Sequence, residues 1–386
     1  MKVLIVTPFL VYPLAHGGRV RTFRLATELA RLGAKVDVLC PWRPGLPGRL
    51  FESDGVTLHP HVFISNALPR LLPERHVPAL VALSWQPFAI GPRRRLNSFS
   101  GHDVIQFELC AHASWMQRVV AGTRTVYSAH NVEVDYFGAR ARRSQASAGM
   151  LRRVEELERL AVASSDLVVA CTEADASRLA EVYGARETVV VPNGCDDELF
   201  GLDRAGLRGS ARASLGIRPD ELCILFVGGP AHHNREAVAY LEDELMPRLG
   251  AGTTLVIAGR CGGRPGRLAR NGGTVLRLSF VQDLRPLLAA ADVAVNPVAY
   301  GSGSSVKLVE YIGARVPVVT TPVGMRGFER FRSNLVVSEL RDFPSAVRSA
   351  AAIPPPNGVA LDELRWSVAG RRLYDAYARL LEERPG

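Results

Sequence analysis

The stretch YGSGSSVKLVEYIGARV, residues 300–316, joins a Gly/Ser loop to a short pattern of helical period. Apolar runs typical of buried strands stand on both sides of it, at 292–298 and 316–322. Lys307 and Glu310 lie three residues apart, so a helix places both on one face. A strand, a loop, a helix and a second strand in this order form the repeating unit of a parallel sheet, which predicts an α/β fold.

The same alternation runs through the whole chain and restarts once. Strands are expected at 2–7, 35–41, 103–109, 124–130, 166–172 and 187–193, and again at 222–229, 253–259, 274–281, 292–298 and 316–322. Helices are expected at 19–33, 150–165, 236–249, 283–291, 305–314 and 366–381. Two successive series of this kind predict two Rossmann-like, doubly wound domains.

The length of 386 residues favours two domains over a single core. The join is expected within 192–210, which is rich in Gly, Asp and Pro. We therefore predict an N-terminal domain over 1–200 and a C-terminal domain over 201–365, with the terminal helix 366–386 packing back on the first domain. The segment 62–100 mixes Pro, Trp and Arg with apolar residues and has no assignable pattern.

The composition is that of an ordinary soluble globular protein, with 47% hydrophobic and 22% charged residues. The formal net charge of +9 comes almost wholly from arginine and favours anionic partners such as nucleotides. No zinc-finger or RNP pattern and no basic stripe interleaved with aromatics occurs, so no nucleic-acid partner is expected. The six cysteines form no CxxC and several lie in apolar runs, which predicts a reducing cytoplasm and no metal site.

The first 18 residues, MKVLIVTPFLVYPLAHGG, could pass for a signal peptide. A buried first strand is the preferred interpretation, because Pro8 ends the apolar run and an amphipathic helix follows. No window of 18 uninterrupted apolar residues occurs, so no membrane span is expected and the protein is placed in the cytoplasm. The arginines at 93–95 and 140–143 leave open a peripheral contact with an anionic membrane, although a solvated surface is favoured.

Two glycine-containing loops stand where a ligand of such a fold is expected. In open α/β sheets, ligands bind outside the carboxyl ends of the strands. The loop with His16, Gly17 and Gly18 follows the first strand, and GSGSS at 301–305 precedes a helix in the second series. Amides at helix starts can approach an anion. The fingerprint GxGxxG is absent after the first strand, which argues against a dinucleotide cofactor.

The order and spacing of eight motifs carry a resemblance to a known family. They are GGRVRTFRLATELARLGAKVDVL (17–39), SAHNVE (128–133), CTEADASRL (171–179), VPNGCD (191–196), FVGGPAHHNREAVAYL (226–241), LVIAG (255–259), FVQDLRPLLAAADVAVNPV (280–298) and GSGSSVKLVEYIGARVPVVTTPVG (301–324). Together they span most of the chain, and each alone is weak. The chain resembles the retaining GT-B glycosyltransferases of family 4, also called glycosyl transferases group 1.

The resemblance implies two Rossmann-like domains that face each other across a cleft. The C-terminal domain would hold a nucleotide-diphosphate sugar donor, and the N-terminal domain would present the acceptor. Glu310 matches the glutamate that binds ribose hydroxyls, a charge-assisted contact. His130, at the end of a strand, matches a histidine that contacts the donor sugar. Lys307 is the best candidate to stabilise the departing diphosphate. No cofactor and no metal are expected.

The remaining donor contacts are expected in loops of the C-terminal domain. They are Gly228, Gly229, Arg260, Phe280, Val281, Leu284, Ser302, Gly303, Ser304 and Ser305. The chain departs from the family pattern at Ser302, where the first glutamate of a pair is usual. It also has Gly229 and Asn234 where many members carry an Arg and a Lys that neutralise the diphosphate, with Arg235 and Arg260 in reserve.

These residues predict a retaining glycosyltransferase that acts on a hydroxyl or amine. The acceptor is left open between a cell-envelope glycan or lipid and a small-molecule natural product. Two alternatives remain at this point: a nucleotide-sugar epimerase or hydrolase of the same architecture, and a non-catalytic protein that binds a sugar nucleotide. Retention of Glu310, Lys307 and His130 argues against the last of these.

Overall fold

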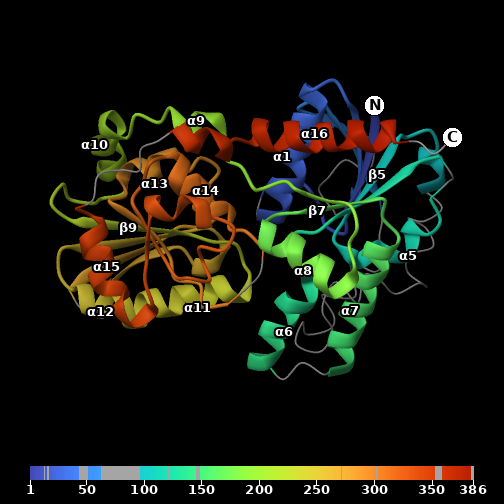
Figure 1. Cartoon of the computed structure of the whole chain (residues 1–386). Coiled ribbons are helices and arrows are strands. Elements are labelled where there is room, and N and C mark those ends of the chain that lie inside the picture. Colours follow the sequence, from blue (N-terminus) through green and yellow to red (C-terminus); the bar gives the residue numbers. More distant parts are fainter. Residues whose placement is uncertain are drawn as a thin grey trace. The chain divides into compact units, whose positions relative to one another are not determined.

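The computed structural model describes residues 1–12, 14, 17–42, 51–61, 96–119, 122–144, 148–270, 272–300, 303–352 and 359–383. The chain divides into two compact units. The first consists of Met1–Leu14, Gly18–Pro192 and Ser367–Gly386, and the second of Ala15–Gly17 and Asn193–Trp366. Each unit is built on one β-sheet covered by helices on both faces (Figure 1).

The first unit has an eight-stranded sheet in the order β3-β4-β2-β1-β5-β6-β7-β8 among the described residues. Its strands are β1 (Lys2–Val6), β2 (Lys35–Pro41), β3 (Phe51–Ser53), β4 (Val56–His61), β5 (Val104–Glu108), β6 (Arg124–Ser128), β7 (Leu167–Ala170) and β8 (Thr188–Val190). All neighbours pair in parallel except β3 and β4, which form an antiparallel edge. The chain order reverses at β1, which lies between β2 and β5.

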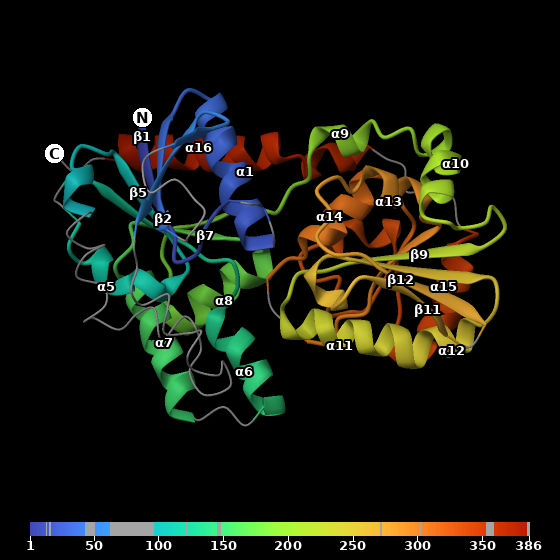
Figure 2. The same cartoon turned by 180° about the vertical axis from the view of Figure 1, so that it is seen from behind.

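The helices of this unit form two layers (Figures 1 and 2). They are α1 (Gly17–Arg31), α5 (Ala113–Met116), α6 (Glu133–Ser144), α7 (Ala148–Ala163), α8 (Glu173–Tyr183) and the terminal α16 (Trp366–Glu382), whose first residue belongs to the second unit. Apolar side chains of α5, α7 and α8 join Ile105, Phe107 and Tyr127 of the sheet in one core. On the opposite face α16 packs closely on α1. The two helices leave no room for a side chain at Gly370, where a Cβ would clash with the side chain of Glu28.

The second unit has a seven-stranded sheet in the order β11-β12-β10-β9-β13-β14-β15 among the described residues. Its strands are β9 (Leu222–Val227), β10 (Thr253–Ala258), β11 (Gly266–Arg270), β12 (Gly273–Arg277), β13 (Val293–Asn296), β14 (Val318–Thr320) and β15 (Leu335–Val337). Only β11 pairs antiparallel in this described sheet. The order reverses at β9, which lies between β10 and β13.

Two helical layers cover the second sheet. The helices are α9 (Asp197–Phe200), α10 (Arg204–Ser214), α11 (His232–Tyr240), α12 (Met246–Leu249), α13 (Arg285–Ala290), α14 (Val306–Gly313) and α15 (Phe343–Ala350). The side chains of α13 and α14 share one core with Leu225 and Ala294. Those of α11 and α15 share another with Ile224 and Val293. Neighbouring residues of a strand thus enter opposite cores, as strand geometry requires.

The predicted α/β architecture of two doubly wound sheets is confirmed. Two details were not predicted from the sequence. The edge strands β3 and β11 pair in antiparallel orientation. The strand β11, GRLAR, is exposed along its whole length and lacks the continuous apolar run that marks a buried strand. The helix expected at 236–249 contains a π-helical turn, Leu241–Leu245, between α11 and α12. The segment 192–210, within which the join was expected, contains α9 and the start of α10, and the two units divide between Pro192 and Asn193.

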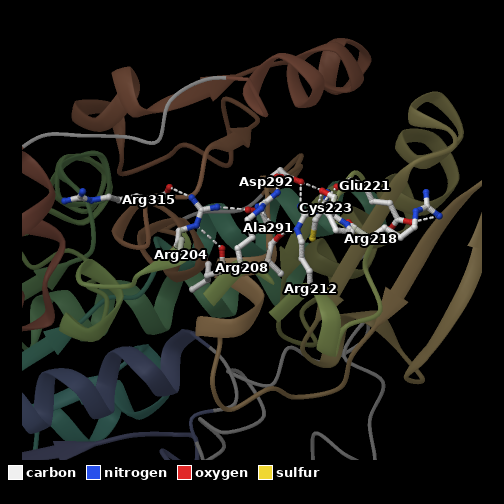
Figure 3. A network of polar contacts seen from close by, with 12 residues as sticks. Arg204, Arg208, Arg212, Arg218, Glu221, Cys223, Ala291, Asp292 and Arg315 are labelled. Atoms are coloured by element: carbon white, nitrogen blue, oxygen red, sulfur yellow. Dashed lines mark hydrogen bonds and ion pairs between the residues drawn. The ribbon is translucent and has the colours of Figure 1, made fainter. Parts of the chain in front are cut away.

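Three arginines on α10 attach it to the end of α13 (Figure 3). Arg204 donates to the carbonyls of Leu288 and Ala291, at 3.1 and 2.5 Å. Arg212 donates from Nε to the carbonyl of Ala290 at 3.0 Å. Arg208 and Arg212 both pair with Asp292. These contacts satisfy carbonyls at the helix C-terminus and place positive charge at its negative dipole end.

The Arg212–Asp292 pair is buried on the arginine side, with 4% of that side chain exposed. Asp292 also accepts from the backbone N–H of Cys223 at 2.7 Å, which links the pair to the start of β9. We predict that Arg212→Met lowers the free energy of unfolding of this unit by about 3 kcal/mol, because the carboxylate loses a buried partner. Urea denaturation monitors the change.

The matched control is Arg218→Met, because Arg218 is 64% exposed and forms a surface pair with Asp220. Its expected effect is below about 1 kcal/mol. Equal midpoints for the two variants would show that the pair does not hold α10 in place.

Candidate functional site

The predicted donor-binding loops follow four neighbouring strands of the second sheet. Gly228 and Gly229 follow β9, Arg260 follows β10, 280–284 follows β12, and 303–305 follows β13. The strands β12, β10, β9 and β13 are adjacent and parallel. Their carboxyl ends therefore meet at one edge, next to the reversal of strand order at β9, where such sheets bind ligands.

Lys307 places a cation at this edge. Its Nζ donates to Asn234 Oδ1 at 2.7 Å and lies 4.3 Å from the centre of the Phe226 ring. Asn234 is buried in the first turn of α11, and its Nδ2 donates to the carbonyl of Gly229 at 3.2 Å. Burial lowers the pKa of Lys307 to about 8, against smaller opposite effects of Cys261 and Glu310. The ammonium is therefore held beside the glycine turn that follows β9.

Only glycine fits at position 228. A Cβ there would lie 2.8 Å from Cys261 Sγ and 3.2 Å from Asn234 Cγ. The backbone N–H of Gly228 donates to Ala258 at 2.9 Å, and its carbonyl accepts from Cys261 at 3.3 Å. The turn is thus tied to the end of β10, and its backbone can approach a ligand closely.

Glu310 lies on α14 one turn after Lys307 and is partly buried. Its charge, added to the effect of burial, raises the pKa of the Cys195 thiol. Ser305 is the N-cap of α14 but makes no side-chain capping bond, and the carbonyl of Ser304 accepts from Asn193 Nδ2 at 3.0 Å. Gly303 has φ of 72°, the left-handed region that favours glycine.

The other predicted donor residues surround this edge. Arg260 and Phe280 are exposed, and Val281 and Leu284 are partly exposed. The loop after β12 is anchored by the N–H of Gly259, which donates to the carbonyl of Ser279 at 3.1 Å. Among the predicted donor residues, exposed surface at or near one edge of the second sheet is thus kept by Arg260, Phe280, Val281, Leu284 and Glu310.

Two predicted residues, His16 and Ser302, lie outside the described residues. Gly17 and Gly18 begin α1. Gly17 belongs to the second unit. A Cβ added at this position would lie 3.3 Å from Val306 Cγ2 at the start of α14. The structure thus places Gly17 next to the loop and helix that carry Lys307.

His130 follows β6 in the first unit and is paired with a buried carboxylate. Its Nε2 hydrogen-bonds Glu108 Oε2 at the end of the neighbouring strand β5. The side chains are 11% and 1% exposed, respectively. Burial alone would raise the pKa of Glu108, but the charge and hydrogen bond of His130 hold it below its ordinary value. Glu108 is therefore ionised at neutral pH.

Sequence reasoning missed Glu108 and its neighbour Gln106. The signal was present in VIQFE, 104–108, where two polar residues alternate with apolar ones in a strand that is buried along its whole length. Glu133, the last residue of the SAHNVE motif, is buried, and burial together with the charge of Glu158 raises its pKa to about 8. Glu158 accepts from the N–H groups of Glu133 and Val134, at 2.8 and 3.2 Å, and so caps the start of α6.

Among the described residues no cluster of three His, Cys, Asp or Glu side chains could hold a metal ion. No helix in the described part of the chain is long and apolar enough to cross a membrane.

Comparison with known proteins places this arrangement in a class. The sucrose-phosphate synthase of Thermosynechococcus elongatus has the same fold, with a TM-score of 0.72 at 18% identity over 99% of this chain and 95% of that one. Anabaena Alr3699/HepE, solved in complex with UDP-glucose, gives a TM-score of 0.61 at 15% identity over 99% and 98%. The fold is thus that of the GT-B glycosyltransferases.

Residues 15–199 match the family model Glycosyltransferase Family 4, and residues 221–352 match Glycosyl transferases group 1. A D-inositol 3-phosphate glycosyltransferase of Actinosynnema mirum is 29% identical over 335 residues, which cover 80% of this chain and 76% of the relative. The chain belongs to the family 4 glycosyltransferases and is a glycosyltransferase. The predicted family and enzyme class are confirmed.

The lowered pKa of Lys307 has a consequence for stability. An unfolded lysine has a pKa of about 10.4. Between pH 8 and about pH 10.4 the unfolded chain binds more protons than the folded chain, so the free energy of unfolding rises with pH. The loss of stability caused by the buried ammonium is therefore complete below pH 8 and disappears as the pH reaches about 10.4. We predict that the free energy of unfolding of Lys307→Met, relative to that of the native chain, is higher at pH 7 than at pH 10. Denaturation of both proteins at the two pH values measures this difference.

Lys35→Met is the control, because Lys35 is exposed at the start of β2. Its stability relative to the native chain should change little with pH. The same pH dependence of stability in both variants would show that Lys307 does not have a lowered pKa in the folded chain.

Proposed function

We propose that this glycosyltransferase moves a sugar from a nucleotide-diphosphate donor to a hydroxyl or amine with retention of the anomeric configuration, in the cytoplasm and without a metal. The observation that supports the donor site is the position of Lys307. Its ammonium lies at the carboxyl edge of the second sheet, bound to Asn234 in the first turn of α11. The solved complex of Alr3699/HepE with UDP-glucose has the same fold and supports a donor of this class.

Each residue of the edge has a role in this proposal. The ammonium of Lys307 and the start of α14 bind the diphosphate, where charge increases as the sugar leaves. The carboxylate of Glu310 accepts hydrogen bonds from the ribose hydroxyls. Backbone groups after β12 receive the base. The backbone at Gly228 and Gly229 lies against the diphosphate and sugar.

In the proposed reaction the acceptor is a weak nucleophile and the nucleoside diphosphate is a good leaving group. The acceptor oxygen or nitrogen bonds to the anomeric carbon on the face from which the diphosphate departs. The bond between that carbon and the phosphate oxygen breaks, and the acceptor proton passes to the departing phosphate. His130 contacts the sugar and orients it.

The choice of acceptor is guided by the relatives and by the charge of the chain. Relatives named D-inositol 3-phosphate glycosyltransferase match up to 88% of this chain, at 26–29% identity over the longer matches. A polyol phosphate is therefore the first acceptor to test, followed by lipid-linked and small-molecule acceptors. The positive net charge of +9 is compatible with an anionic acceptor.

The proposal is tested by incubating the protein with UDP-, GDP-, ADP- and TDP-sugars, with and without an acceptor panel. Nucleotide release that requires acceptor, together with an NMR spectrum in which product and donor share one anomeric configuration, is the expected result. Release without acceptor would indicate hydrolysis instead. Inverted product would exclude retention, and donor binding without turnover would indicate a binding protein.

We predict that Lys307→Ala lowers kcat by about 100-fold, because one preorganised charge at the developing diphosphate is lost. Circular dichroism and melting curves check that the variant folds. Lys35→Ala serves as the matched control and should keep native turnover. Near-native turnover of Lys307→Ala would remove this residue from the mechanism.

A further inference from the structure

A chain of buried hydrogen bonds connects the terminal helix to His130 in the first unit. Tyr377 of α16 donates its hydroxyl to Gln106 Oε1 on β5. Gln106 donates from Nε2 to Glu108 Oε1, and Glu108 Oε2 is bound to His130 Nε2. Tyr377 and Gln106 are 0% and 1% exposed, so water does not compete for these bonds.

The fold brings all four side chains together. Gln106 and Glu108 are two apart on β5, so both leave the same face of the sheet, opposite Ile105 and Phe107. That face is the one covered by α16. The contact between Tyr377 and Gln106 joins positions 271 residues apart.

The bonds also have a fixed direction. A carboxylate can only accept, so both its oxygens receive hydrogens, one from Gln106 and one from His130. Gln106 can donate to Glu108 and accept from Tyr377 only in one of its two amide orientations. Reversal would turn its carbonyl toward the carboxylate. Arg21 of α1 adds a nearby positive charge that lowers the pKa of Glu108.

We propose that Glu108, Gln106 and Tyr377 are positioning residues that hold the His130 ring in one orientation and with its proton on Nε2. The proposal rests on the proposed role of His130 in binding the donor sugar. A carboxylate partner that fixes the tautomer and orientation of a histidine is a general device in protein sites.

The direct test is the protonation pattern of His130 in the native protein. Histidine labelled with ¹⁵N is introduced, and the signal of His130 is assigned as the one lost in His130→Ala. The expected spectrum at pH 7.5 shows Nε2 bearing a proton. The opposite tautomer, with a proton on Nδ1 alone, would overturn the proposal, because the Glu108 carboxylate has no hydrogen to give. This result does not depend on activity.

Kinetic measurements test whether these hydrogen bonds affect turnover. Tyr377→Phe removes one hydroxyl from a buried ring and is expected to lower kcat by about three- to tenfold with little change in the donor KM. Tyr240→Phe is the matched control, because its hydroxyl donates to the carbonyl of Leu340 at 2.6 Å in the second unit. The control should keep native kcat.

A double-mutant cycle separates positioning from a general loss of structure. In a His130→Ala background the added Tyr377→Phe change should have no further effect on kcat, because the residue through which it acts is gone. An equal effect of Tyr377→Phe in both backgrounds would overturn the proposal. If His130→Ala alone keeps native turnover, the role of His130 in the proposed function fails, whereas the NMR result still stands or falls separately.

Discussion

Parallel strand pairing is the constraint on which both candidate sites depend. When strands run in one direction, their carboxyl ends lie at one edge, and the loops that follow them meet there. Gly228 and Lys307 are far apart in sequence, yet β9 and β13 are neighbours in the second sheet. In the first sheet the same rule brings Glu108 at the end of β5 to His130, which follows β6.

The charge of each site is set by a few buried contacts. In the second unit a lysine ammonium is bound to Asn234 and lies over Phe226, in a setting that weakens its hold on the proton. In the first unit a carboxylate is kept ionised by His130 and by Arg21. A cation that is partly desolvated before a ligand binds interacts more strongly with an anion than one exposed to water. The second site therefore suits a diphosphate.

Much of this organisation could be predicted from the sequence, because apolar runs and helical periods are local signals. The strand before Gly228, the helix with Lys307 and Glu310, and the terminal helix were all predicted. Contacts between distant residues were not. Asn234 and Lys307 are 73 positions apart, and Tyr377 and Gln106 are 271 apart, so no local pattern pairs them. The edge strand β11 was missed because its exposed sequence, GRLAR, has no continuous apolar run.

In the proposed mechanism Lys307 provides the positive charge for a bound diphosphate. Because its pKa is about 8, part of the population is neutral at pH 8, and a bound diphosphate should draw a proton onto it. Calorimetric titration with the tightest-binding nucleoside diphosphate, in buffers of different ionisation enthalpy, counts this proton. We expect uptake of about half a proton per site at pH 8 in the native protein and none in Lys307→Met. Equal proton uptake by both proteins, with equal affinity, would contradict it.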